Sequence, residues 1–287
     1  MAPKVSMTVQ MNTDRPIPTI GLGVYLLPLD KTAEIVETAL NIGYRHFDSA
    51  RLYGNEEETA EGIANFLEKN PNVFRSDIFY TTKIWPSDFG YDKTMAAVKD
   101  SYDLVKKSIG YIDLILLHTP ESTTQKRLES YRALQDAVEQ GIVKNIGVSN
   151  YGVAHLKELL AYPELKYKPV VNQIEINPWL QHVDITQFCK NNDILIQAYS
   201  PLMFGGRLRD PQIVKLADKY KKTPAQILIR WNLQKGFIPL PKSVHAHRIL
   251  ENFTVFDFEI SDQDVEDLGD KTSHYYGSPG SDPTKAP

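Results

Sequence analysis

The sequence predicts an α/β protein: a (β/α)8 barrel, or TIM barrel, preceded by a short β-hairpin. Short apolar segments rich in β-branched residues recur about every 25–35 residues, and segments with helical periodicity lie between them. This strict alternation of strand and helix is typical of a parallel sheet. Eight strands within roughly 250 residues fit a closed barrel better than an open, doubly wound sheet.

The strands of the barrel are predicted from eight apolar segments. Ile112–Leu117 is apolar except for Asp113, as expected for a strand that is buried on both faces. The expected strands are Thr19–Tyr25, Arg45–Ser49, Ile78–Lys83, Ile112–Leu117, Lys144–Val148, Val170–Glu175, Leu195–Tyr199 and Phe237–Leu240.

The helices are predicted from apolar residues that recur with a period of about 3.6. In Thr32–Ile42, for example, Ala33, Val36, Ala39 and Leu40 share one face. Thr223-Pro224 has the form of a helix start, because proline lacks an N–H that the first turn does not need. The expected helices are Thr32–Ile42, Glu56–Lys69, Lys93–Ser108, Arg127–Glu139, Ala154–Leu160 and Thr223–Gln234.

The two ends of the sequence lie outside this alternation. Val5–Ile20 is expected to form a polar hairpin in front of the barrel. Ser273–Pro287 is rich in glycine, serine and proline, so we expect an irregular tail from about residue 273. Since no linker interrupts the pattern, residues 1–287 are expected to form a single barrel domain.

Composition excludes several classes of function. The chain has 42% hydrophobic and 24% charged residues and a formal net charge of −4 with acids and bases interspersed, which predicts neither a nucleic-acid nor a membrane partner. No segment has the apolar length of a membrane span, and the N-terminus lacks a signal-peptide pattern. The single cysteine, Cys189, indicates a reducing compartment. We therefore expect a cytoplasmic protein, and a monomer.

Polar residues follow the ends of the predicted strands, where barrels of this kind carry their active sites. Asp48 ends the second strand and Tyr53 follows it, Lys83 ends the third strand, and His118 follows the fourth. Each alone has an ordinary structural explanation, such as a helix cap, a packed ring or a solvated amine. Their position on consecutive strands indicates an active site. The other histidines show no metal-ligand spacing, so we expect no metal.

With these residues in place, the sequence resembles the aldo-keto reductase family from about residue 8 to residue 270. The resemblance is closest to its fungal-type NADPH-dependent carbonyl and aldehyde reductases. It rests on many motifs: GLGVY (21–25), GYRHFDSA (43–50), LYGNE (52–56), KIW (83–85), DLILLH (113–118), IGVSN (146–150), QIE (173–175), AYSPL (198–202) and PKS (241–243). It implies an enzyme that reduces aldehydes and ketones to alcohols by hydride transfer from NADPH.

The resemblance implies a role for each of the four strand-end residues. Tyr53 would be the general acid, Asp48 and Lys83 would tune it, and His118 would orient the substrate carbonyl. Physical chemistry supports these roles. A free tyrosine, with a pKa of about 10, is a poor acid near neutral pH, and a nearby ammonium lowers that value. A donor at His118 stabilises the developing alkoxide.

The resemblance also implies the cofactor contacts. Tyr199 would stack on the nicotinamide, and its carboxamide would be bound by Ser149, Asn150 and Gln173. The 2′-phosphate that distinguishes NADPH from NADH would be bound by Lys242, Ser243 and Arg248. The glycines at 21 and 23 do not make a Rossmann fingerprint. The expected cofactor residues are Gly23, Val24, Asp48, Ser149, Asn150, Gln173, Tyr199, Ser200, Leu202, Lys242, Ser243, Arg248, Glu251 and Asn252.

The substrate pocket departs from the family pattern. Thr119 stands where many animal members have tryptophan, Val24-Tyr25 where Thr-Trp is common, and His245 replaces a threonine, which weakens one phosphate contact. The expected substrate contacts are Tyr25, Trp85 and His118, with Tyr275 and Tyr276 of the tail nearby. Such an aromatic pocket suits small aldehydes, α-dicarbonyls or aryl ketones.

Two other functions fit parts of the pattern. A barrel aldolase would form a Schiff base on Lys83 or Lys242. A cofactor-binding regulatory subunit of the same fold would bind NADPH with little turnover.

Overall fold

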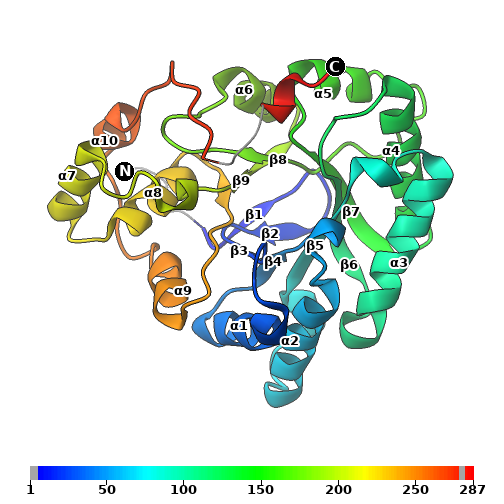
Figure 1. Ribbon diagram of the computed structural model, residues 1–287, viewed down its shortest axis with the longest axis horizontal. Coiled ribbons are helices and arrows are strands. Elements are labelled where there is room, and N and C mark those ends of the chain that lie inside the picture. Colours follow the sequence, from blue (N-terminus) through cyan, green and yellow to red (C-terminus); the bar gives the residue numbers. More distant parts are fainter. Residues whose placement is uncertain (1–5, 278–281) are drawn as a thin grey trace.

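Eight parallel strands surround the centre of the molecule in this computed structural model, which describes residues 6–277 and 282–287 (Figure 1). Each strand pairs with the next along the chain. Gly21 N donates to Pro239 O and Gly23 N to Pro241 O, both at 3.1 Å, and these bonds join the first strand to the last. The strands are β3 (Leu22–Gly23), β4 (His46–Asp48), β5 (Phe79–Ile84), β6 (Ile112–Leu117), β7 (Val143–Ser149), β8 (Val171–Glu175), β9 (Leu195–Tyr199) and β10 (Ile238–Pro239).

The predicted (β/α)8 barrel is thus confirmed, and each predicted strand is present. The first and last are shorter than expected, because β3 and β10 each contain only two residues in regular pairing. Every residue of β5 and β6 is buried, since the barrel interior lies on one face and the helices on the other.

Helices cover the outside of the barrel (Figure 1). The six predicted helices are present, with ends that differ by a few residues. Thr223 and Gln226 form the capping box that starts α8, with Pro224 in its first turn. The helices are α1 (Leu29–Ile42), α2 (Glu56–Lys69), α3 (Tyr91–Ile109), α4 (Thr124–Glu139), α5 (Val153–Leu160), α6 (Val183–Asn191), α7 (Pro211–Tyr220), α8 (Pro224–Gln234), α9 (Ala246–Phe253) and α10 (Asp262–Asp267).

Four of these helices, α6, α7, α9 and α10, were not predicted. They are six to ten residues long, so each shows at most about two apolar repeats. None of the described helices is long and apolar enough to cross a membrane.

The predicted N-terminal hairpin pairs β1 (Thr8–Gln10) with the antiparallel β2 (Pro16–Pro18). It is less polar than expected, because Met11 and Ile17 pack against a buried cluster at the amino end of the barrel strands. Thr13 Oγ1 donates to Asn145 Oδ1 at 3.0 Å. The hairpin therefore covers the floor of the barrel and leaves the opposite end for the site. Val5, the first residue of the predicted hairpin, lies outside the described residues.

The tail returns to the barrel at α4 and α5. Residues 273–277 contain neither helix nor strand, and Pro283–Lys285 form one 3-10 turn. Arg127 Nη1 donates to Pro287 O at 2.8 Å, and His155 Nε2 lies 2.9 Å from Ala286 O. Gly152 allows this close approach, since a Cβ there would lie 2.2 Å from Thr284 O.

Candidate active site

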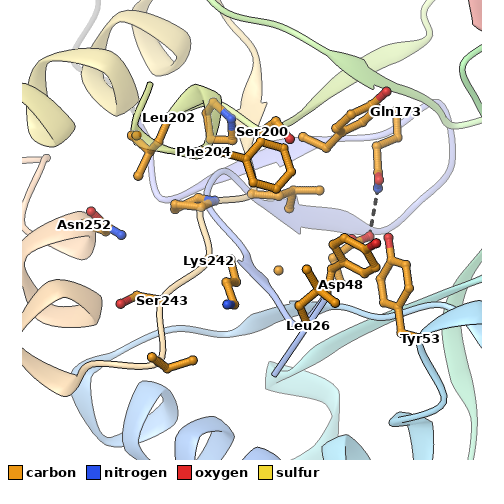
Figure 2. Close-up of a pocket in the computed structure, with 18 of the residues that line it drawn as sticks. Leu26, Asp48, Tyr53, Gln173, Ser200, Leu202, Phe204, Lys242, Ser243 and Asn252 are labelled. Atoms are coloured by element: carbon orange, nitrogen blue, oxygen red, sulfur yellow. Dashed lines mark hydrogen bonds between the residues drawn. The ribbon is translucent and has the colours of Figure 1, made fainter. Parts of the chain in front are cut away.

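A cavity of about 920 Å3 opens at the carboxyl ends of the barrel strands. All but three of the residues that the sequence predicted for the site line it; the exceptions are Val24, Lys83 and Tyr275. Figure 2 shows Asp48 and Tyr53 on one side of this cavity and Ser243 and Asn252 on the other, with Lys242 between them. The barrel thus brings residues from both ends of the sequence into one elongated site.

Lys83 is the buried centre of the catalytic group. Its ammonium is completely buried at the end of β5 and donates to Asp48 Oδ2 at 2.7 Å and to Ser49 O at 2.8 Å. The Tyr53 hydroxyl oxygen lies 3.3 Å from Lys83 Nζ. Because Lys83 does not line the cavity, it is poorly placed to form a Schiff base with a substrate.

A buried asparagine fixes the loop that carries Tyr53. Tyr53 ends a 3-10 turn, Arg51–Tyr53, between β4 and α2. Asn55, which starts α2, accepts a hydrogen bond from Ser49 Oγ at 2.9 Å and donates one to Val24 O at 2.8 Å. The turn is therefore tied to the ends of both β3 and β4, so the Tyr53 hydroxyl has a defined position before any ligand binds.

Burial dominates the electrostatics of Tyr53 and Lys83. Burial, with further contributions from Asp48 and Tyr25, raises the pKa of Tyr53 well above its usual value. Burial also lowers the pKa of Lys83, although Asp48 opposes this effect. The prediction that Lys83 lowers the pKa of Tyr53 is therefore wrong for this structure, because the low-dielectric surroundings outweigh the ammonium. Tyr53 therefore keeps its proton at every physiological pH.

His118 follows β6 and forms the wall beside Tyr53. Its ring meets Trp85 edge to face, with ring centroids 5.0 Å apart, and lies 5.8 Å from the ring of Tyr53. Burial, and then Lys83, hold the pKa of His118 well below its usual value, so the imidazole is neutral. Its Nδ1 is buried without a hydrogen-bond partner among the described groups. A neutral imidazole can still donate one N–H to an oxygen in the cavity.

A network of amides and hydroxyls connects the catalytic group to the next strands. Gln173 Nε2 donates to Asp48 Oδ1 at 2.8 Å, a bond drawn in Figure 2. Ser149 Oγ donates to Gln173 O at 2.8 Å, and Tyr199 OH to Asn150 Oδ1 at 3.0 Å. These bonds hold Ser149, Asn150, Gln173 and Tyr199 in one layer across β7, β8 and β9.

The far end of the cavity carries positive charge. Lys242, Ser243 and Arg248 line it, and partial burial lowers the pKa of Lys242. Glu251 accepts a hydrogen bond from Thr223 Oγ1 at 2.7 Å. Among the described residues, no group of three or more acidic, histidine or cysteine side chains is arranged to hold a metal ion.

Two residues of the predicted pocket lie elsewhere. The Val24 side chain is buried in the core with that of Leu22, because extended backbone turns both away from the cavity that Gly23 lines. Tyr275 is not in the lining, since its ring packs on Arg207, which also packs on Trp179. Tyr276, in contrast, lines the cavity.

The cavity also contains residues that the sequence reading missed, notably Leu26, Leu52, Phe204, Glu121, His247 and Pro283. All but His247 lie in loops or 3-10 turns, where periodicity gives no signal, and His247 lies in the first turn of the short helix α9. Leu26 and Phe204 are exposed and have positive φ angles of 56° and 52°, which no sequence pattern indicated.

Comparison with known proteins agrees with this geometry. The model of the Aldo/keto reductase family matches residues 19–272. The chain belongs to this family. As an aldo-keto reductase it is 46% identical over 253 residues to an uncharacterized oxidoreductase of Saccharomyces cerevisiae, covering 88% of this chain and 89% of that protein. It is 39% identical over 262 residues to a glyoxal reductase of Bacillus subtilis, covering 91% of each.

Solved structures of aldo-keto reductases share the fold. A crystal structure from Brucella melitensis superposes with a TM-score of 0.84 at 39% identity, over 91% of this chain and 97% of that one. A Bombyx mori aldo-keto reductase in complex with NADP has a TM-score of 0.84 at 32% identity, over 91% of each chain. The family resemblance and the barrel inferred from the sequence are both confirmed.

Proposed function

We propose that this aldo-keto reductase reduces aldehydes and ketones to alcohols by hydride transfer from NADPH, with Tyr53 as the general acid. One observation carries the proposal: a protonated tyrosine hydroxyl lies 3.3 Å from a completely buried ammonium, at the wall of an open cavity. The relatives with oxidoreductase names favour turnover over a purely regulatory role.

The donor set fits a nicotinamide dinucleotide phosphate. When bound, NADPH supplies the hydride that the carbonyl carbon accepts. Asn150 and Gln173, with Ser149, would hold the carboxamide, and Tyr199 offers a ring for stacking. Lys242 and Arg248 would bind the 2′-phosphate at the far end of the cavity. The Bombyx mori relative in complex with NADP supports this choice of cofactor.

Tyr53 provides the proton that completes reduction. Its hydroxyl donates to the carbonyl oxygen, which becomes the alcohol oxygen, and an alkoxide is more basic than the phenolate left behind. The Lys83 ammonium stabilises that phenolate, while Asp48 holds the ammonium in place. The His118 N–H would donate to the same oxygen and stabilise its developing negative charge. Tyr53 then regains its proton from solvent.

The substrates we propose are small aldehydes, α-dicarbonyls and aryl ketones. Tyr25, Trp85 and Tyr276 make the wall around the catalytic group aromatic. The similarity to a glyoxal reductase supports the dicarbonyls. The test is a panel of carbonyl compounds that includes free sugars, with NADPH oxidation followed by absorbance. A higher kcat/KM for free sugars than for every other carbonyl would contradict this assignment.

We also infer that the enzyme acts as a cytoplasmic monomer. The single cysteine, Cys189, is buried, and burial raises the pKa of its thiol to about 12, so it is suited to a reducing compartment and not to crosslinking. Cell fractionation and the mass in solution test this inference.

A further inference from the structure

The charges that line the cavity are unevenly distributed. Among the described lining residues, the charged side chains are Asp48, Glu121, Lys242, Arg248 and Glu251. The last three lie at the far end of the cavity. In its catalytic half, which is the half beside Tyr53 and His118, the charge of Asp48 is compensated by Lys83 at 2.7 Å. The carboxylate of Glu121 is therefore the charge that a carbonyl substrate meets in this half.

The segment that carries Glu121 is fixed next to the catalytic group. It follows β6 directly after His118, so the Cα atoms of His118 and Glu121 lie within roughly 11 Å of each other. Thr119, which is buried, donates from Oγ1 to Glu121 Oε2 at 3.0 Å. Arg127 on α4 donates from Nη1 to Pro120 O at 2.9 Å. These two bonds hold the carboxylate and its backbone in place.

No ion pair with a described residue neutralises Glu121. Its side chain is exposed and has the hydroxyl of Thr119 as its hydrogen-bond partner. A neighbouring groove, which shares Glu121 in its lining, contains Lys126, Arg127 and Lys285. Arg127 and Lys285 each pair with another carboxylate. Lys126 lines the groove but not the cavity, so the negative charge of Glu121 faces the substrate without a cation beside it in the cavity wall.

Two further carboxylates lie behind the aromatic wall of the catalytic half. Burial, and then Glu175, raise the pKa of Tyr199. Burial, and then Asp282, raise the pKa of Tyr276. Both tyrosines line the cavity, so these carboxylates add to the negative potential that Glu121 produces there.

We propose that Glu121 is a specificity-determining residue that makes the enzyme select neutral and cationic carbonyl compounds over anionic ones. This inference rests on the proposed function and narrows its substrate class. Glutamate is ionised at neutral pH, and like charges about 10 Å apart near a protein surface repel each other measurably. Aldehydes with an ammonium group should therefore be favoured, and 2-oxo acids should be disfavoured. Thr119, which departs from the family pattern, supports this selection because its hydroxyl holds the carboxylate.

The probes are three para-substituted benzaldehydes of similar size that differ in charge. The benzoate 4-formylbenzoate is an anion, its methyl ester is neutral, and 4-(trimethylammonio)benzaldehyde is a cation. The substituents themselves change the reactivity of the carbonyl group, so each compound is compared between the wild type and the variants. Values of kcat and KM are measured by the oxidation of NADPH at a saturating concentration, which removes any difference in cofactor binding.

Glu121→Gln keeps the length of the side chain and an acceptor for Thr119, and it removes the charge. We expect kcat/KM for the anion to rise by about three- to tenfold and that for the cation to fall by a similar factor, mainly through KM. Glu121→Lys should move both values further in the same directions, and the neutral ester should change least. Salt at about 0.5 M should reduce these differences, because it screens an exposed charge.

The control is Glu61→Gln, which removes the same charge from an exposed residue of α2 that does not line the cavity. It should match the wild type with all three aldehydes. Equal changes for the three aldehydes in Glu121→Gln would overturn the inference, because they would indicate a structural role. Unchanged kinetics in both Glu121 variants would also overturn it, and both outcomes would leave carbonyl reduction intact. A wild type that reduces none of the aldehydes would instead refute the proposed function, and this inference with it.

Discussion

Tyr53 is distinguished from its aromatic neighbours by one contact, the Lys83 ammonium 3.3 Å from its hydroxyl. Tyr53→Phe removes the transferable proton and leaves the ring, so we expect carbonyl reduction to fall by about 10²–10⁴-fold. NADPH affinity should stay close to that of the wild type. Steady-state NADPH oxidation and fluorescence titration measure the two effects.

Tyr25→Phe is the matched control, because the Tyr25 ring lies 4.9 Å from that of Tyr53 in the same cavity. It should change KM more than kcat. Nearly full turnover in Tyr53→Phe would mean that another residue donates the proton.

Arg248 and Lys242 are expected to recognise the 2′-phosphate. Since charge-assisted hydrogen bonds contribute about 1.5–3 kcal/mol each, Arg248→Ala or Lys242→Ala should weaken NADPH binding by roughly ten- to a hundredfold. NADH binding should change little. Both affinities are measured on each variant at one ionic strength. An equal loss of affinity for the two cofactors would show that these cations act on the fold and not on the phosphate.

The sequence predicted most of the candidate site, because the carboxyl ends of the strands in a closed barrel meet at one face, whatever the conformation of the loops. Asp48 and Lys83 lie at the ends of β4 and β5 and His118 follows β6, strands whose register the apolar pattern determines, and the three lie together as expected. The position of Val24 in the core depends on side-chain alternation over a two-residue strand, which the pattern could not resolve. The raised pKa of Tyr53 depends on how deeply its hydroxyl is buried, and the sequence pattern did not predict this burial.

At the scale of elements, α4 holds the tail, and the tail contributes Tyr276 and Pro283 to the wall of the cavity. Arg127 is buried on α4, donates to Pro120 O and Pro287 O, and pairs with Glu158. In the wild type the tail places Tyr276 and Pro283 in the cavity wall. Arg127→Met removes the bonds that hold this tail, so both residues should lose their fixed positions. We expect KM for carbonyl substrates to rise several-fold, with a smaller change in kcat and in NADPH affinity.

Two further variants separate this effect from a general loss of stability. Gly152→Ala should raise KM in the same way, because its methyl group would meet Thr284 O. Arg132→Ala is the control on the same helix, since Arg132 is partly exposed and pairs with Glu164 at 3.6 Å. If Arg127→Met lowered the thermal stability but left KM unchanged, the tail would have no role in substrate binding.

The elements that escaped prediction share a physical reason. The helix α9 exposes half of its residues and fully buries only Ile249 and Asn252, so tertiary contacts decide its structure more than periodicity does. The first strand and last strand have few paired residues, because ring closure is completed by single backbone bonds at Gly21 and Gly23. Such long-range contacts leave no local signature.

At the scale of the whole molecule, buried histidines make stability depend on pH. His46 is completely buried, and burial lowers its pKa to about 4 from 6.5. Between these values the unfolded chain binds more protons at this position, so stability is retained above about pH 6.5 and falls as the pH falls toward 4. Between pH 7 and pH 5, the protonation of His46 in the unfolded chain should lower the free energy of unfolding by about 2 kcal/mol.

His46→Asn removes this titration, so its free energy of unfolding should fall less between pH 7 and pH 5 than that of the wild type. Urea denaturation at each pH gives the two slopes, and only the slopes are compared because the substitution itself disturbs the core. The exposed His274→Asn should keep the wild-type slope. Identical slopes for His46→Asn and the wild type would contradict the assignment.

We propose that residues 1–287 form one domain. The barrel closes through bonds between residues near 21 and residues near 240, so no part of the ring is complete without the rest. Thermal unfolding should give a single calorimetric transition whose van't Hoff and calorimetric enthalpies agree. Two resolved transitions would show that the barrel divides into independent units.

Because Lys83 is enclosed, chemical labelling of its amine can report when the barrel unfolds. Reagents that acylate amines reach Lys242, which is exposed, but have no path to Lys83, whose side chain is completely enclosed. The rate of acylation at Lys83, measured by mass spectrometry, therefore reports how often the barrel opens. The rate at Lys242 instead depends on whether a ligand occupies the cavity. One labelling experiment thus measures both global opening and protection by a ligand.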